Sequence, residues 1–167
     1  MSLIDPAEIE DRDDGGEAIS LGRAANTMLT GLRMMVVGRG ECPALRRLFV
    51  ELCGPRGEEA LIGLFVIVKQ VAFRSRRRLS VHAPGCAAIS SDELIFLSAL
   101  AAAQQPETDG QGRERLWLAS LLGAGADKVV SGSLRSLAGL LASAGQTLDM
   151  DDWRPGPCLR ARPRSVH

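Results

Sequence analysis

Aromatic residues are scarce in this chain of 167 residues, which has no tyrosine, four phenylalanines and two tryptophans. The packed strands of a β-sandwich normally contain more aromatic and β-branched residues than this. The apolar residues are instead mostly Leu, Ala and Val, and this composition favours helices. The length is sufficient for one domain with a substantial hydrophobic core. We therefore predict a single all-α domain.

The chain also lacks net charge, because 20 basic side chains balance 20 acidic ones. A neutral protein has no overall electrostatic attraction to nucleic acid or to an anionic membrane. The longest apolar run, residues 60–68, is far shorter than the roughly 20 residues that a membrane span needs. The N-terminus is acidic and has no apolar segment of the kind found in signal peptides. We expect a cytoplasmic protein without a membrane contact.

Sequence motifs of catalysis and cofactor binding are missing as well. The phosphate-binding pattern GxxxxGK[ST] is absent, and no GxGxxG follows a predicted strand. No carboxylate pair in the predicted helices has the spacing used by glycosidases or metal hydrolases. The four cysteines include no CxxC pair, so we expect reduced thiols in a cytosol. We predict that the protein is not an enzyme and holds no cofactor and no metal.

The two ends of the chain carry opposite charges. Residues 1–18 are acidic, and residues 147–167 are rich in proline and arginine. Neither segment has enough apolar surface to offset the entropy lost on ordering, so we expect flexible tails around a helical domain at residues 19–146. The alternative is that one tail binds a charged partner. The carboxylates of the first tail are Asp5, Glu8, Glu10, Asp11, Asp13, Asp14 and Glu17.

Apolar spacing predicts six helices within the domain. They cover about residues 21–37, 41–53, 57–73, 90–105, 113–122 and 127–144. Helix 57–73 is apolar on most sides, which is typical of a buried central helix. Residues 78–83 alternate apolar and polar side chains, which predicts one short extended segment. The predicted architecture is a compact bundle of five or six helices around a central apolar helix.

The most distinctive stretch is residues 74–93, which interrupts the helical pattern. Ser90 and Glu93 have the S-x-x-E spacing of a capping box, which predicts a helix start. Free N–H groups and the helix dipole at such a start favour an anion, and arginine suits phosphate. Arginines that end a helix also complement its negative C-terminus, and this structural role explains part of the cluster. The predicted interaction or anion surface consists of Arg74, Arg76, Arg77, Arg78 and Ser90.

His82 and Cys86 are the one His/Cys pair close together in the sequence, on either side of a Pro-Gly turn. Nearby arginines and a helix N-terminus favour a reactive thiolate at Cys86. A zinc site would need more ligands, and Cys42 and Cys53 lie roughly 16 Å apart if they share one unbroken helix. A thiol- or metal-dependent sensor that uses His82 and Cys86 is therefore the first alternative function.

Weak binding of nucleic acid is the second alternative. The arginine cluster has no aromatic residues interleaved for base stacking, so it is a poor nucleic-acid signature. The junction between helices 113–122 and 127–144 has the better geometry for a helix-turn-helix. Its second helix is expected to expose Lys128, Ser131, Ser133, Arg135 and Ser136. We consider nucleic acid an improbable partner because the net charge is zero.

From about residue 33 to residue 146 the order of features resembles a family of small helical proteins from alphaproteobacteria. The features are a glycine-ended helix, a long apolar helix, a short basic stretch leading into Pro and Cys, and a Ser/Thr-x-x-Glu helix start. The residues that carry the resemblance are Gly54, 61–68, Arg77, Arg78, Pro84, Cys86 and 90–93. In that family several cysteines cluster before the helix with the Ser/Thr-x-x-Glu start, whereas this chain has only Cys86 there. The family has no established activity, so the resemblance implies only a helical fold and a cytoplasmic location.

The leading functional prediction rests on a competent core without a complete catalytic, cofactor or nucleotide site. We expect a non-enzymatic cytoplasmic accessory or regulatory protein that acts through contact with a protein partner or through self-association. The surface at residues 74–90 is the predicted place of contact.

Overall fold

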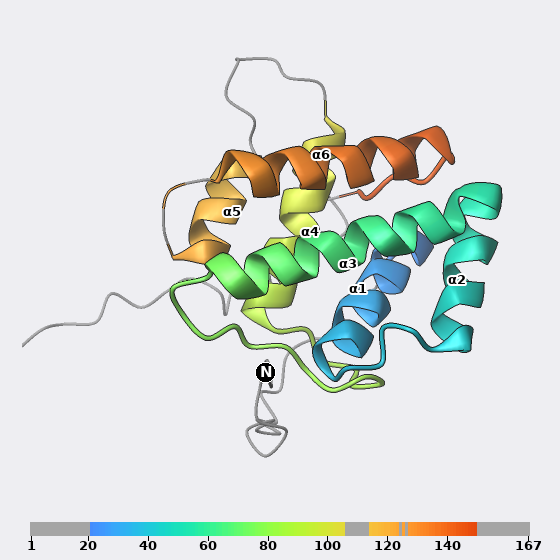
Figure 1. Ribbon diagram of the computed structural model, residues 1–167, viewed down its shortest axis with the longest axis horizontal. Coiled ribbons are helices and arrows are strands. Elements are labelled where there is room, and N and C mark those ends of the chain that lie inside the picture. The colour runs from blue at the N-terminus through green and yellow to red at the C-terminus, as the bar shows by residue number, and fades with distance from the viewer. Residues whose placement is uncertain (1–20, 106–113, 124, 126, 150–167) are drawn as a thin grey trace, which may run out of the picture.

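The computed structural model describes residues 21–105, 114–123, 125 and 127–149 (Figure 1). These residues form six α-helices and no strand, which confirms the predicted all-α bundle. The helices are α1 (Arg23–Val36), α2 (Pro43–Cys53), α3 (Gly57–Arg74), α4 (Ser91–Gln104), α5 (Glu114–Leu122) and α6 (Lys128–Ser143), and a 3₁₀ turn, η2 (Gly54–Arg56), joins α2 to α3. No helix among the described residues is both long and apolar enough to cross a bilayer.

The most deeply buried helix of the bundle is α4, which packs against α1, α5 and α6. Figure 1 shows α3 and α6 side by side across one face of the molecule, with α4 behind them. Helix α3 packs against α1, α2, α5 and α6, as predicted for a central helix, but the prediction that it is buried on most sides is wrong. The side of α3 that carries Ala60, Leu64, Ile67 and Val71 is buried, whereas much of the opposite side is exposed because no described element covers it.

The start of α4 is the predicted capping box. The Ser90 hydroxyl accepts a hydrogen bond from the Glu93 backbone N–H at 3.2 Å, and the Glu93 carboxylate accepts one from the Ser90 N–H at 2.8 Å. At the other end Gln105 is extended, as expected of a residue that precedes proline. Local sequence signals thus fix both ends of the most buried helix.

The register of α6 also follows the sequence. The Asp127 side chain caps the helix by accepting hydrogen bonds from two backbone N–H groups of the first turn. Val130, Leu134, Leu137 and Leu141 are buried at the predicted spacing. Apolar periodicity predicts this helix well because one of its sides faces the core and the other faces solvent.

The packed domain extends two residues beyond the predicted boundary at residue 146. The Leu148 side chain is 3% exposed, and the Leu148 N–H donates to Gln104 Oε1 at 2.8 Å. The Gln104 amide in turn donates to the Gln146 carbonyl, so this short stretch is held against the end of α4. The predicted tail at residues 1–18 lies outside the described residues, as does most of the one predicted at residues 147–167, from residue 150 onward.

Two glycines allow helices to approach closely. A Cβ on Gly31 of α1 would lie 2.5 Å from the Leu64 side chain of α3. A Cβ on Gly57, at the start of α3, would lie 2.5 Å from backbone atoms of Phe49 and Val50 in α2. Real Cβ atoms do not approach other atoms so closely, so a larger residue at Gly57 requires the backbones of α2 and α3 to move apart, and one at Gly31 requires the Leu64 side chain to move.

We expect Gly57→Ala to lower the free energy of unfolding by about 1–3 kcal/mol, because the backbone of α2 must shift to admit the methyl group. The matched control is Gly132→Ala in the exposed part of α6, where nothing lies within 4 Å of the added Cβ. That change should raise stability by about 0.5–1 kcal/mol. Urea unfolding measures both values, and a harmless Gly57→Ala would contradict the close contact between α2 and α3.

Candidate functional site

The segment between α3 and α4 is organised by a buried ion pair that links α1 to α4. Arg33 Nε lies 2.7 Å from Glu93 Oε1, and Arg33 Nη2 lies 2.9 Å from Glu93 Oε2. The two side chains are 5% and 0% exposed. Their geometry is bidentate, the strongest arrangement of arginine with a carboxylate.

Both charged groups of this pair also hold the backbone of residues 75–90. The guanidinium donates to the carbonyls of Cys86 and Ala88, each at 2.6 Å. The carboxylate accepts from the backbone N–H groups of His82 at 3.0 Å and Ser90 at 2.8 Å. Two buried side chains thus fix the connecting segment at four points, which explains how a stretch without regular secondary structure keeps one path.

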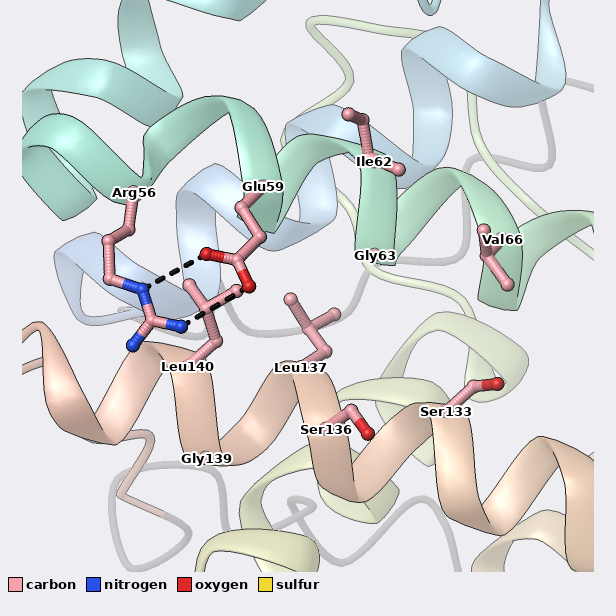
Figure 2. Close-up of a pocket in the computed structure, with 10 residues that line it drawn as sticks. All are labelled: Arg56, Glu59, Ile62, Gly63, Val66, Ser133, Ser136, Leu137, Gly139 and Leu140. Carbon is pink, nitrogen blue, oxygen red and sulfur yellow. Dashed lines mark hydrogen bonds and ion pairs between the residues drawn. The ribbon is translucent and has the colours of Figure 1, made fainter.

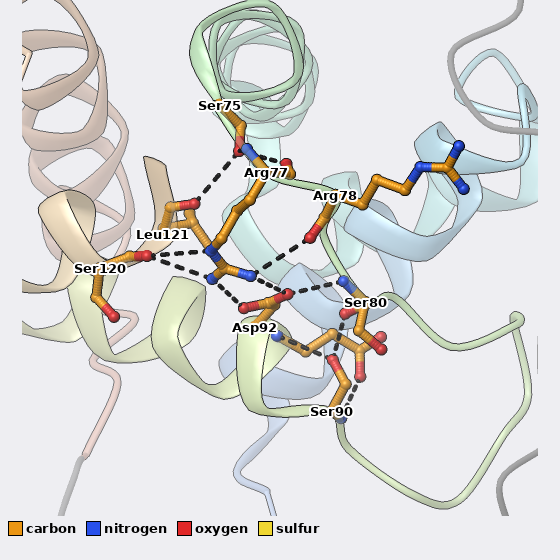
Figure 3. A network of polar contacts seen from close by, with 9 residues as sticks. Ser75, Arg77, Arg78, Ser80, Ser90, Asp92, Ser120 and Leu121 are labelled. Carbon is orange, nitrogen blue, oxygen red and sulfur yellow. Dashed lines mark hydrogen bonds and ion pairs between the residues drawn. The ribbon is translucent and has the colours of Figure 1, made fainter. Parts of the chain in front are cut away.

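A second polar network anchors the beginning of the same segment (Figure 3). Arg77 forms a bidentate pair with Asp92, and its guanidinium also donates to the Ser120 carbonyl of α5. Asp92 accepts a further hydrogen bond from the Ser80 N–H at 2.7 Å. The hydrogen bond that Arg77 donates to Asp92 raises the pKa of the Arg77 guanidinium.

The five residues of the predicted anion surface are thus not gathered in one open site. Arg74 pairs with Asp127, Arg77 pairs with Asp92, and Ser90 is buried in the helix cap. The Arg78 guanidinium points away from this network in Figure 3. Arg76 is exposed and forms no ion pair with a residue that the structure describes. Much of the cluster therefore serves the fold.

The structure places His82 and Cys86 on either side of the predicted turn, and both are half-buried. The Cys86 N–H donates to the Ala83 carbonyl at 3.1 Å, and Gly85 has the positive φ of 89° that this turn requires. Within the described parts of the chain, no three His, Cys, Asp or Glu side chains converge on a metal position. The thiol-dependent sensor therefore stays a hypothesis. Its metal-dependent form has no set of ligands among the described residues.

The proposed helix-turn-helix junction is occupied by a third polar cluster. Glu114 of α5 is buried and accepts hydrogen bonds from Ser131 at 2.9 Å and from Arg135 Nε at 2.7 Å. Burial acts to raise the pKa of Glu114, but these hydrogen bonds outweigh it and lower the pKa below the ordinary value of 4.5. Two of the five residues expected to face phosphate are therefore engaged inside the protein, and nucleic-acid binding stays a hypothesis.

An exposed apolar surface on α3 was not predicted. Its apolar side chains are Ile62, Phe65, Val66 and Phe73, and Ile62 and Phe73 are 63% and 82% exposed. With Lys69, at the same helical spacing, they form what we call the outer face of α3. The available signal was the apolar residues on two opposite sides of this helix, a pattern that fits either a buried helix or a helix with one uncovered apolar side.

A groove runs along this surface between α3 and α6 (Figure 2). Its volume is about 490 Å³, and its lining includes Ile62 and Val66 from α3 and Ser133 and Ser136 from α6. An ion pair of Arg56 with the Glu59 carboxylate lines the groove as well. The two glycines in the lining, Gly63 and Gly139, leave parts of it without side chains. The groove is open and largely apolar.

The charges around the outer face are predominantly positive. Lys69 Nζ lies 5.4 Å from the centre of the Phe65 ring, a cation–π contact. Lys69, Arg76 and Lys128 form no ion pair with any residue in the described ranges. The carboxylates nearby are already paired with arginines, namely Glu58 with Arg46, Glu59 with Arg56, and Asp127 with Arg74. The outer face therefore combines apolar side chains with a rim of unpaired cations.

Comparisons of the chain with protein-family models, with curated proteins and with solved structures give no match. The resemblance to the alphaproteobacterial helical family stays a prediction.

We expect Arg33→Met to lower the free energy of unfolding by about 3–5 kcal/mol, because it leaves Glu93 as a buried, unpaired carboxylate. Arg33→Lys keeps the positive charge but cannot form the bidentate pair, so its free energy of unfolding should fall by a smaller amount. Hydrogen exchange at the His82 and Ser90 amides should accelerate in both variants. The control is Arg46→Met, which removes an exposed pair and should change stability by at most about 1 kcal/mol. Equal losses at Arg33 and Arg46 would contradict the structural role of the buried pair.

The pH dependence of stability should report on Glu114. The pKa of Glu114 is lower in the folded protein than in the unfolded chain. Its contribution to the free energy of unfolding is therefore complete above about pH 4.5 and is lost as the pH falls through the folded pKa. The stability difference between the wild type and Glu114→Gln should therefore narrow as the pH is lowered from about 6 toward about 3, the range in which carboxyl groups titrate. Urea unfolding across this range measures the difference. A constant difference would show that the ionised form of Glu114 is not the one stabilised.

Proposed function

We propose that the protein is a non-enzymatic cytoplasmic accessory or regulatory protein that binds a protein partner through the outer face of α3. The observation that carries the proposal is the set of four large apolar side chains exposed on one side of this helix, Ile62, Phe65, Val66 and Phe73. Contiguous apolar patches of this kind mark interaction surfaces in soluble proteins. Phenylalanine is also enriched at protein interfaces.

The proposed place of contact thus moves from residues 74–90 to the neighbouring helix. In residues 74–90, Arg74, Arg77 and Ser90 already have partners within the molecule. Their binding to another protein would first break these contacts. The apolar side chains of α3 have no such competing contacts, so burying them is favourable at about 25 cal/mol per Å².

The kind of partner follows from the shape and charge of this surface. A groove between two helices fits an amphipathic helix or an extended segment that inserts apolar side chains. The unpaired cations Lys69, Arg76 and Lys128 favour carboxylates at the edge of that segment. Self-association through the same face would bring these cations toward their copies across a two-fold axis, which is unfavourable. We therefore propose a different protein with an acidic, apolar segment over a second copy of this chain.

The test compares full-length variants as bait in extracts of the native cells, treated with nuclease under reducing conditions. Ile62→Gln combined with Phe73→Gln should reduce recovery of one stoichiometric partner at least tenfold, which corresponds to about 1.4 kcal/mol. The control is Leu116→Gln, a side chain of α5 that is 76% exposed. Circular dichroism confirms that each variant remains helical.

The partner identified in this way is then purified and titrated against the same three proteins. Binding that weakens with salt and is lost only in the α3 double variant supports the proposal. A partner retained equally by all three proteins, or lost only with Leu116→Gln, contradicts it.

A further inference from the structure

We propose that the acidic N-terminal residues 1–20 of the same chain bind the outer face of α3 and compete with the partner for it. This inference rests on the proposed function, because it concerns the regulation of that surface. The N-terminal segment would cover the apolar side chains when no partner is present. A partner with a similar acidic and apolar segment would displace it.

The described domain and the N-terminal segment carry opposite net charges. The described residues carry fourteen basic and nine acidic side chains, a net charge of +5. Residues 1–20 carry one basic and seven acidic side chains, a net charge of −6. The zero net charge of the whole protein thus conceals a basic domain and an acidic segment joined to it. Opposite charges of this size attract each other when both are in one molecule.

The N-terminal segment also carries apolar residues. Leu3, Ile4 and Ile9 lie among its carboxylates. The outer face offers apolar side chains and Lys69, and Arg76 follows two residues after the end of α3; neither cation forms an ion pair with a described residue. Apolar contact and charge pairing can therefore occur together, which a purely acidic or a purely apolar segment would not achieve.

The N-terminal segment is also long enough to reach the outer face of α3. The chain enters the described domain at the start of α1, where the Arg23 guanidinium donates to the Glu51 carbonyl near the end of α2. The end of α2 leads through η2 directly into α3, so residue 21 lies toward the N-terminal end of the outer face. Twenty extended residues span at most about 70 Å. The 18 residues of α3 measure about 27 Å, so the segment can reach its whole length.

Residues 150–167 and a second copy of the domain could also cover the outer face, but their charges suit it less well. Residues 150–167 contain four arginines and two aspartates, so the unpaired cations repel them. A second copy of the domain would present the same cations to each other. A tethered segment also has an effective concentration of about 1 mM, so a contact with a dissociation constant of about 0.1 mM would be roughly 90% formed. Such a contact lowers the apparent affinity of a competing partner for the outer face about tenfold.

The experiment uses the full-length chain and methyl and aromatic NMR signals of Ile62, Val66 and Phe73. In one variant, Glu8, Glu10, Asp11, Asp13 and Asp14 are changed to Gln or Asn. The control variant changes Asp151 and Asp152 to Asn, so that two carboxylates are removed from the other end of the chain. Each protein is measured at about 0.05 M and 0.5 M salt and over a tenfold range of protein concentration.

We expect the three signals to shift in the acidic-segment variant and to shift in the same direction in the wild type at high salt. The control variant should match the wild type, and dilution should change nothing because the contact is within one molecule. Fluorescence of an added apolar dye should rise several-fold in the acidic-segment variant. Identical α3 signals in all three proteins would overturn the proposal. Shifts that disappear on dilution would also overturn it, since they would identify a second copy as the occupant.

The outcome is separable from the test of the proposed function. If the N-terminal variant leaves the α3 signals unchanged while the Ile62 and Phe73 double variant still loses its partner, this inference fails and the proposed function stands. If the N-terminal contact is present but the partner ignores the α3 substitutions, the proposed function fails instead.

Discussion

The ion pair of Arg33 with Glu93 connects three parts of the molecule that nothing in the local sequence brings together. It joins α1 to α4, and its remaining hydrogen-bonding groups hold the backbone between α3 and α4. A charge this deeply buried is tolerated only when it is paired and hydrogen-bonded. Here the carboxylate accepts from the guanidinium and from two backbone N–H groups, so its burial is compensated. This pair therefore fixes the second half of residues 75–90, and the Arg77–Asp92 pair fixes the first half.

This arrangement separates the polar interior contacts from the surface that is left open. Arg77 and Arg74 bind carboxylates that cap or begin neighbouring helices, which fastens the C-terminal end of α3 to α4 and α6. One side of α3 is thereby pressed against the bundle, and its other apolar side faces outward. The pair with Arg74 occupies Asp127, while Arg46 and Arg56 occupy Glu58 and Glu59, and no carboxylate of the described residues pairs with Lys69.

The parts of the fold that could be predicted depend on residues close together in the sequence. The Ser90–Glu93 cap and the buried spacing of α6 follow from contacts within one or two turns, and both were predicted. The Arg33–Glu93 pair spans 60 residues, and no local pattern indicates it. The burial of α3 was mispredicted because apolar residues around a helix do not tell whether neighbours cover both sides. The candidate surface at residues 74–90 was placed beside the exposed one, since sequence cannot show which arginines already hold a carboxylate.

The central claim is that the outer face of α3 is a site of contact with another protein. Site-specific photocrosslinking in the native cells tests it most directly, with benzoylphenylalanine introduced at position 73 and, separately, at position 116. Both side chains are largely exposed, but only Phe73 belongs to the outer face. The account predicts an adduct with one partner protein from position 73 and none with that partner from position 116. An adduct from position 116 alone would contradict it, as would none from position 73.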